Sequence, residues 1–320
     1  MLVIFATLLS FLAVGSFAFF SSWAHALFWV PFAGIVGLCV GSFLNVVVYR
    51  LPLMLERGYD HACRERLGIA SPAPEGVFNL CTPHSHCPSC KRLIEARELF
   101  PVVSYLALRG KCAGCKTPIS SRYPLVELSC GILTAAAVAG YGPTWLAVAV
   151  VGFLWASMAA ALIDADTFML PDELCMPLLW AGILAAAGGV GPLLPDAILG
   201  VAAGYGVLWA MNKVCYLTQG QEGMGGGDFV YFAACGAFLG WRALACLFLL
   251  AGVTGTAYGL YRAVHRAPPD AGRGEAGTQD PGVGQPPSGA IPFGPHLAAA
   301  AGVLLLLKPF SWKLGLQFLY

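Results

Sequence analysis

Long apolar runs, separated by short polar segments, dominate this chain of 320 residues. A helix needs about 20 apolar residues to cross a bilayer, and eight runs reach or approach that length. They cover residues 2–20, 27–48, 124–141, 145–163, 173–190, 197–212, 244–261 and 291–307. A ninth run, at 228–241, is short, and its glycines Gly236 and Gly240 allow close helix approach. The pattern predicts an all-α polytopic membrane protein, a bundle of eight or nine transmembrane helices.

Two polar segments interrupt these runs. Residues 51–123 carry eleven basic side chains when Arg50 at their edge is included, together with four paired cysteines, and we expect a polar insert. Residues 267–289 are rich in Pro, Gly and Asp, which predicts a flexible linker. The expected units are N-terminal transmembrane helices at 1–50, a tetracysteine insert at 51–123, a transmembrane core at 124–266, the linker at 267–289, and a last transmembrane helix with its tail at 290–320. The first run lacks a preceding basic segment, which favours a retained helix over a removed signal peptide.

Composition agrees with a membrane protein and excludes several partners. The chain is 58% hydrophobic and 11% charged, with a mean hydropathy of +0.72, which is too apolar for a soluble domain of this size. A net charge of +1 indicates neither nucleic acid nor an acidic polymer as a partner. The lipid bilayer is therefore the expected surrounding.

The basic residues predict which side of the membrane the insert faces. Lys and Arg near helix ends favour the cytoplasmic side. With the insert inside, fifteen of the eighteen basic residues are cytoplasmic, and only Arg242, Lys308 and Lys313 lie outside. The opposite topology would reverse that ratio, so we expect a cytoplasmic insert.

Two acidic residues at helix ends are the strongest catalytic candidates. Asp164 ends one predicted helix and Asp228 begins another, and both fall at the expected cytoplasmic boundary. Two carboxyls brought close together cannot both ionise cheaply, so one can act as an acid and the other as a base on a shared water, as in aspartic proteases. The glycines 225–227 before Asp228 would admit an extended substrate strand. The alternative is a helix cap or solvated boundary acid, which we expect for Asp172 and Asp196, and a solvated loop position for Asp166.

Several motifs together resemble the bacterial type IV prepilin leader peptidase family. They are Gly225-Gly226-Gly227-Asp228, Asp164 followed by Leu170-Pro171-Asp172, the segment GSFLNVVVYRLP from Gly41 to Pro52, and the late IPFGP from Ile291 to Pro295. The resemblance implies an aspartic endopeptidase of the bacterial inner membrane, with Asp164 and Asp228 as the catalytic pair at the cytoplasmic face. It implies that the enzyme removes the basic leader of type IV prepilins and pseudopilins after a glycine. It also implies N-methylation of the new N-terminus with S-adenosylmethionine. The family usually has Lys where this chain has Val230, and a further frequent Lys is missing before the late motif.

The insert contains a metal-binding pattern. Cys87-Pro-Ser-Cys90 and Cys112-Ala-Gly-Cys115 are two CxxC pairs separated by 21 residues. Such pairs present four thiolates to one tetrahedral zinc ion, which predicts a closed structural zinc site. His84 and His86 precede the first pair, and we expect them to be exposed loop residues rather than ligands. An alternative is a membrane thiol oxidoreductase, but that function needs the pairs on the oxidising side of the membrane.

Methyl transfer rests on the resemblance, because no soluble methyltransferase fingerprint is present. The polar residues Asn45, Arg50, Glu127 and Glu222 stand in family-like contexts near the cytoplasmic face and are candidates for the substrate or methyl-donor site. Each could equally be a helix-end anchor or an interhelical hydrogen-bonding group. A third function, a proton-coupled transporter using the carboxylate pair, is consistent with membrane acids. No inverted internal repeat supports it.

Overall fold

A computed structural model describes residues 23–70, 76–220, 223–265 and 291–311, and its regular elements are all helices. The larger ones are α2 (Trp23–Leu67), α4 (Arg122–Tyr141), α5 (Trp145–Thr167), α6 (Asp172–Ala187), α7 (Leu194–Gln219), α8 (Gly226–Leu239), α9 (Ala243–His265) and α10 (Gly294–Leu307). The short ones are η1 (Ala96–Leu99), α3 (Val103–Ala107) and η2 (Lys308–Phe310). The prediction of an all-helical chain is confirmed over these residues.

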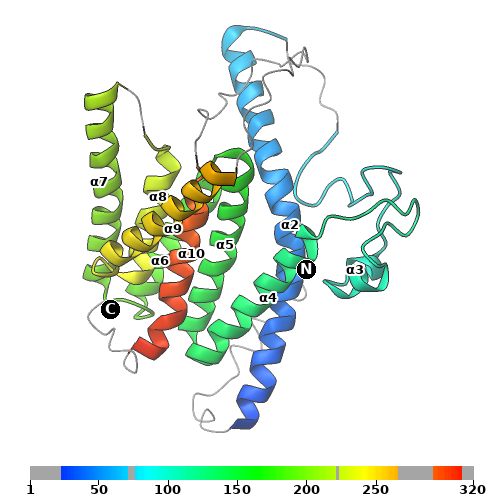
Figure 1. Cartoon of the computed structure of the whole chain (residues 1–320), viewed down its shortest axis with the longest axis horizontal. Helices are drawn as coiled ribbons and strands as arrows, with labels where there is room; N and C mark the ends of the chain where they lie inside the picture. Colours follow the sequence, from blue (N-terminus) through cyan, green and yellow to red (C-terminus); the bar gives the residue numbers. More distant parts are fainter. Residues whose placement is uncertain (1–22, 71–75, 221–222, 266–290, 312–320) are drawn as a thin grey trace.

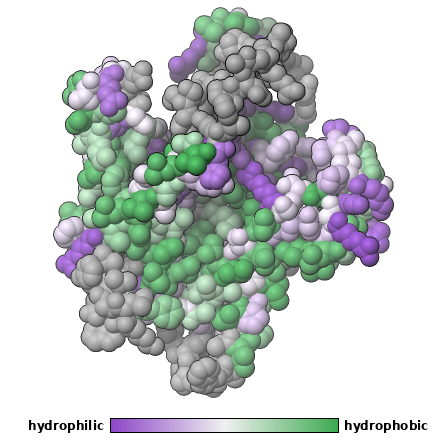
Figure 2. Space-filling model, in the orientation of Figure 1, coloured by the Kyte–Doolittle hydropathy of each residue, from purple (hydrophilic) through white to green (hydrophobic). Residues whose placement is uncertain are grey.

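Five helices, α2, α4, α5, α7 and α9, are long and apolar enough to cross a membrane, while α8 and α10 are shorter apolar helices. The protein is therefore a multi-pass membrane protein. The run at 2–20 and the linker at 267–289 lie outside the described residues, so the total of eight or nine spans stays a prediction. Figure 2 shows apolar surface over the lower part of the bundle and polar surface gathered on the tetracysteine insert.

The first described helix is longer than its apolar run. The sequence predicts a span over 27–48, but α2 continues through Pro52 to Leu67. The first part of the 51–123 segment is thus a polar extension of a membrane helix. The remainder carries the cysteines and has little regular structure.

Helix α8 lies at the centre of the bundle. Its 14 residues span only about 21 Å at 1.5 Å per residue, and every residue from Phe229 to Leu239 is buried. Helices α7 and α8 touch through their backbones, since a Cβ at Gly200 would overlap Gly236 and the reverse is also true. Figure 1 shows α2 and α7 on opposite sides of the bundle, with α5, α9 and α10 between them.

Candidate active site

The two acidic residues singled out above lie at helix ends that meet. Asp164 is in the last turn of α5 with a relative exposure of 5%, and Asp228 is in the first turn of α8. The two helix ends are held together through Leu170, which packs against Gly227, beside Asp228, and against Gly294, whose amide reaches Asp164. Asp228 Oδ1 is buried and has no hydrogen-bond partner among the described residues. A polar atom in that state is a natural place for a water molecule to bind.

Leu170, in the segment between α5 and α6, packs between the starts of two further helices. A Cβ on Gly227 would lie 2.5 Å from the Leu170 carbonyl oxygen. On the other side, a Cβ on Gly294, the first residue of α10, would lie 2.8 Å from Asp164 Oδ2 and 3.1 Å from Leu170 Cδ2. Glycine is therefore required at both positions for the backbones to approach this closely. These contacts fix the distance between the two acidic helix ends.

The start of α10 also holds the Asp164 side chain directly. The Gly294 amide donates a hydrogen bond of 2.9 Å to Asp164 Oδ2. The amide belongs to the late IPFGP motif, 130 residues away in sequence. Sequence reasoning identified this motif but assigned it no role, because nothing in the order of residues indicates which carboxylate the amide reaches.

Asn212 was not singled out by the sequence and supports the glycine-rich segment. Its Oδ1 accepts hydrogen bonds from the amides of Gly223 and Met224, at 2.8 and 3.1 Å. Because α7 carries Asn212 on its last turns, this side chain ties the segment preceding Asp228 to a membrane helix. The sequence feature that could have identified Asn212 is its position as a polar residue at the end of the apolar run 197–212.

The other three aspartates considered in the sequence analysis lie at helix ends. Asp166 lies in the last turn of α5 rather than in a loop, and Arg122 at the start of α4 pairs with it through two hydrogen bonds of 2.9 and 2.6 Å. Asp172 and Asp196 lie in the first turns of α6 and α7, the positions expected for boundary acids. Asp196 also accepts a hydrogen bond from the indole of Trp241.

A groove of about 380 Å³ opens beside the acidic pair, within the range of volumes found for ligand pockets. Helices α2, α6, α7 and α8 contribute to it, together with the segment 169–171. Its lining residues are Leu55, Tyr59, Met169, Leu170, Pro171, Asp172, Glu173, Met176, Tyr205, Gly226, Gly227 and Val230.

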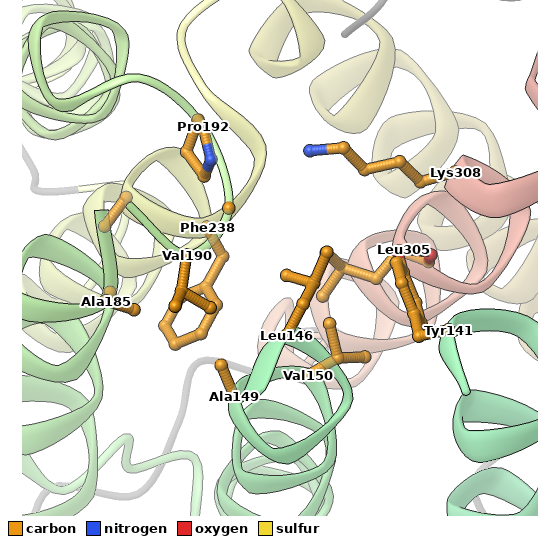
Figure 3. A pocket seen from close by; sticks show the side chains of 13 residues that line it. Tyr141, Leu146, Ala149, Val150, Ala185, Val190, Pro192, Phe238, Leu305 and Lys308 are labelled. Carbon is orange, nitrogen blue, oxygen red and sulfur yellow. Dashed lines mark hydrogen bonds between the residues drawn. The ribbon is translucent and has the colours of Figure 1, made fainter. Parts of the chain in front are cut away.

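A second cavity lies at the other end of α10, where Tyr141, Leu146, Phe238 and Lys308 converge (Figure 3). Its volume of about 10 Å³ has room for roughly one water molecule. Lys308 directly follows the 14 residues of α10, which begins at Gly294, so the two lie about 21 Å apart at 1.5 Å per residue. This cavity is therefore not part of the candidate site.

The four predicted cysteine ligands form one cluster. The Sγ atoms of Cys87, Cys90, Cys112 and Cys115 all lie within 4.8 Å of one another. The pair Cys87 and Cys115 is 3.8 Å apart, which matches the separation of about 3.8 Å expected between sulfurs that each lie about 2.3 Å from a tetrahedral zinc ion. The cluster therefore has the spacing needed to hold a metal ion.

The two CxxC turns are built alike. In each, the first cysteine's amide donates to a carbonyl five residues on, at 2.9 Å in both turns, and the residue after the second cysteine has a positive φ. The Thr117 hydroxyl and amide lower the pKa of the Cys115 thiol to about 6, and backbone hydrogen bonds lower the pKa of Cys87. Both shifts favour the thiolate, the form that binds metal, whereas burial and the neighbouring thiols raise the pKa of Cys90. His84 and His86 are exposed and are not part of the cluster.

The other candidate residues attach the insert to the membrane helices. Arg50 is 7% exposed and donates to the carbonyls of Asn79, Leu80 and Pro83, at 2.9, 3.3 and 2.6 Å. Glu127, 8% exposed, accepts a 2.7 Å hydrogen bond from the Val102 amide.

Two polar candidates remain. The Asn45 amide donates to the carbonyls of Gly41 and Tyr123, both at 3.3 Å. Glu222 lies outside the described residues. Together with Arg50 and Glu127, Asn45 lines the junction between α2, α4 and the insert rather than a single cluster with the acidic pair.

Comparison with known proteins matches the chain in two consecutive parts. Residues 35–141 match the Bacterial Peptidase A24 N-terminal domain, and residues 151–260 match the Type IV leader peptidase family. A prepilin leader peptidase/N-methyltransferase of Stutzerimonas stutzeri is 41% identical over 88% of this chain and 92% of its own length. Relatives of the same description from Burkholderia pseudomallei strain K96243 and Pseudomonas aeruginosa are 43% and 41% identical, over 89% and 92% of this chain and 88% and 96% of their own lengths. No solved structure matches the chain.

Proposed function

Because this chain belongs to the prepilin leader peptidase/N-methyltransferase family, we propose that Asp164 and Asp228 are the catalytic pair of its endopeptidase. Membership of this family identifies the chain as an enzyme of the type IV leader peptidase class. The observation that supports the assignment is that Leu170 and the start of α10 bring the ends of α5 and α8 together beside an open groove.

The chemistry follows from two neighbouring carboxyl groups that share one proton. The ionised carboxylate takes a proton from a water molecule as that water attacks the peptide carbonyl carbon, and the protonated carboxyl donates a hydrogen bond to the carbonyl oxygen. The proton then passes to the leaving amine. The Gly294 amide supports this step by holding the Asp164 side chain in one orientation. No covalent intermediate with the protein is needed.

We place the reaction at the cytoplasmic face of the bacterial inner membrane, with type IV prepilins and pseudopilins as substrates. The contact of Arg122 with Asp166 ties the end of the insert to the turn that carries Asp164, so the insert and the acidic pair share one face. The excess of basic residues on that face supports a cytoplasmic orientation. A substrate with a basic leader followed by an apolar helix can present its scissile bond at this depth without crossing the bilayer.

We assign a structural zinc ion to the cluster of Cys87, Cys90, Cys112 and Cys115. Four thiolates close the tetrahedral coordination and leave no position for a reacting water. The ion would stabilise an insert that has little core of its own. The insert in turn contacts the catalytic region, because Leu80 packs in the cluster that contains Ile163, next to Asp164.

We propose methyl transfer as the second activity, with S-adenosylmethionine supplying a methyl group bound to a sulfonium. The protein must align the new N-terminal amine with that methyl group and exclude water. Asn45, Arg50, Glu127 and Glu222 remain candidates for this site. The insert contacts of Arg50 and Glu127 support a role in shaping it rather than in direct transfer.

The test is to incubate the purified protein with a prepilin peptide and isotopically labelled S-adenosylmethionine and to measure the masses of the products by mass spectrometry. Cleavage after the leader glycine, followed by gain of one labelled methyl group, is the expected result. Metal content and thiol state are measured on the same sample. Metal-free protein with interconverting disulfides and no cleavage would instead favour the thiol oxidoreductase. Proton flux in vesicles without cleavage would favour the transporter.

A further inference from the structure

The groove next to Asp228 has chemistry that extends the proposed function, on which this inference rests. Gly226 and Gly227 form part of its wall immediately before Asp228, and Asp172 and Glu173 contribute from the start of α6. Open space lies where a Cβ on Gly226 would be, whereas Leu170 already packs against Gly227, so a peptide backbone can approach the acidic pair along Gly226. The position of the groove makes it the natural approach for a substrate.

The groove changes from acidic to apolar with depth. Helices α6 and α8 both begin at the face that carries the acidic pair, and their first turns supply Asp172, Glu173 and the two glycines. One helical turn further along each helix, the lining residues are Met176 on α6 and Val230 on α8. A ligand that fits this gradient carries positive charge at the outer end and apolar side chains at the inner end.

The acidic rim is available to a ligand. Asp172 and Glu173 are exposed, and neither forms an ion pair within the described residues. The groove has no Lys, Arg or His in its described lining, so no cation of the protein neutralises them from its walls. Two exposed carboxylates alone would be an ordinary solvated surface. Their place on the rim of a groove that continues into apolar side chains makes them part of a peptide subsite.

The apolar end has an aromatic wall. Tyr205 on α7 lines the groove, and its ring packs edge-on against Phe229, with centroids 5.9 Å apart at 85°. Phe229 directly follows Asp228, so this ring lies near the reacting groups. Edge and face contacts with such a ring favour aromatic and large apolar side chains.

We propose that this groove is the prepilin-binding subsite, in which Asp172 and Glu173 bind the Lys and Arg side chains of the leader. In the same groove, Met176, Tyr205 and Val230 receive the apolar residue that follows the cut. The scissile peptide then lies along Gly226, next to the acidic pair. The two ends of the groove thereby set the register in which the chain is cut.

A binding measurement tests this subsite separately from cleavage. The full-length protein in lipid nanodiscs is titrated against two fluorescent prepilin peptides, one with its basic leader and one with every leader Lys and Arg replaced by Gln. The variant Asp172→Asn/Glu173→Gln should bind the basic peptide about five- to tenfold more weakly, the sum expected for two solvent-exposed charge pairs. Its affinity for the neutral peptide should change less than about twofold. The weakening should shrink at high salt, which screens exposed charges.

The matched control is Glu56→Gln/Glu65→Gln, which removes two exposed carboxylates of α2 that do not line the groove and should leave both affinities unchanged. In cleavage assays the groove variant should raise KM for the basic peptide with kcat unchanged. The variant Asp172→Lys/Glu173→Lys should prefer a peptide whose leader carries Glu.

Equal weakening for both peptides, no weakening for either, or the same loss in the control would overturn the subsite. Its failure is distinguishable from failure of the peptidase proposal. Binding that depends on leader charge, in a wild-type protein that cuts neither peptide, would leave the subsite standing and refute the assigned reaction. Cleavage together with binding that does not depend on leader charge would refute the subsite and leave the assigned reaction standing.

Discussion

Replacing Gly227 by alanine probes the contact that sets the spacing of the acidic pair. The added Cβ would lie 2.5 Å from the Leu170 carbonyl oxygen and 2.8 Å from Leu170 Cβ. A carbon and a carbonyl oxygen normally approach no closer than about 3.3 Å. The start of α8 or the segment carrying Leu170 must therefore move by roughly 0.8 Å, and Asp228 moves with α8. A misplacement of about 1 Å in a catalytic constellation lowers the rate about 100-fold, so we expect kcat for prepilin cleavage to fall by about that factor.

The assay is kcat for cleavage of a prepilin peptide by purified protein in detergent, alongside helix content and thermal unfolding. Gly225→Ala is the matched control, because its Cβ would meet Asp228 Oδ2 at an ordinary 3.9 Å. Its backbone is extended, with φ −75°, a conformation that alanine adopts freely. The control should stay within about threefold of the wild type. Wild-type kcat in Gly227→Ala, with a folded protein, would refute the claim that this contact positions Asp228.

Further predictions concern the insert and its attachment. The purified protein should contain one zinc ion per chain. Either Cys87→Ser or a strong chelator should release that ion and speed proteolysis between residues 76 and 121. Full activity and unchanged proteolysis in metal-free protein would contradict the structural role of the ion. Arg50→Ala should loosen the insert, at a cost of on the order of 3 kcal/mol for buried hydrogen bonds from a charged group, seen as faster insert cleavage. Arg50 and Arg57 both lie over the ring of Phe78, so Arg57→Ala, which removes only such a ring contact, should cost less. The half-exposed ion pair of Arg122 with Asp166 should contribute about 1 kcal/mol or less in a double-mutant cycle, and a much larger coupling would show that it does more than join two helix ends.

Much of the fold could be predicted from the sequence because bilayer-length apolar runs have few alternatives to helices. The runs at 124–141 and 145–163 correspond to α4 and α5, with small differences at the ends. The extension of α2 to Leu67 could not be predicted from hydropathy, because its last turns are polar. Helix α8 was recognised as short, but its burial in the centre of the bundle depends on partners distant in sequence.

The candidate site also contains some residues that could be predicted from the sequence and others that could not. The two acidic residues and the four cysteines could be found from local pattern, since each has a characteristic neighbourhood in sequence. The Gly294 amide, the Asn212 side chain and the contact of Gly227 with Leu170 could not, because each joins segments whose proximity arises only in the folded bundle. The ion pair of Asp166 belongs to this second group.

The central claim is that Asp164 and Asp228 act together on one water molecule. The most direct test replaces each by asparagine, which keeps the shape but cannot exchange the proton, and follows prepilin cleavage by mass spectrometry with helix content and zinc content as folding controls. We predict that Asp164→Asn and Asp228→Asn each leave the prepilin uncut while the protein remains folded. Leader cleavage at a rate within tenfold of the wild type by either variant would contradict the account.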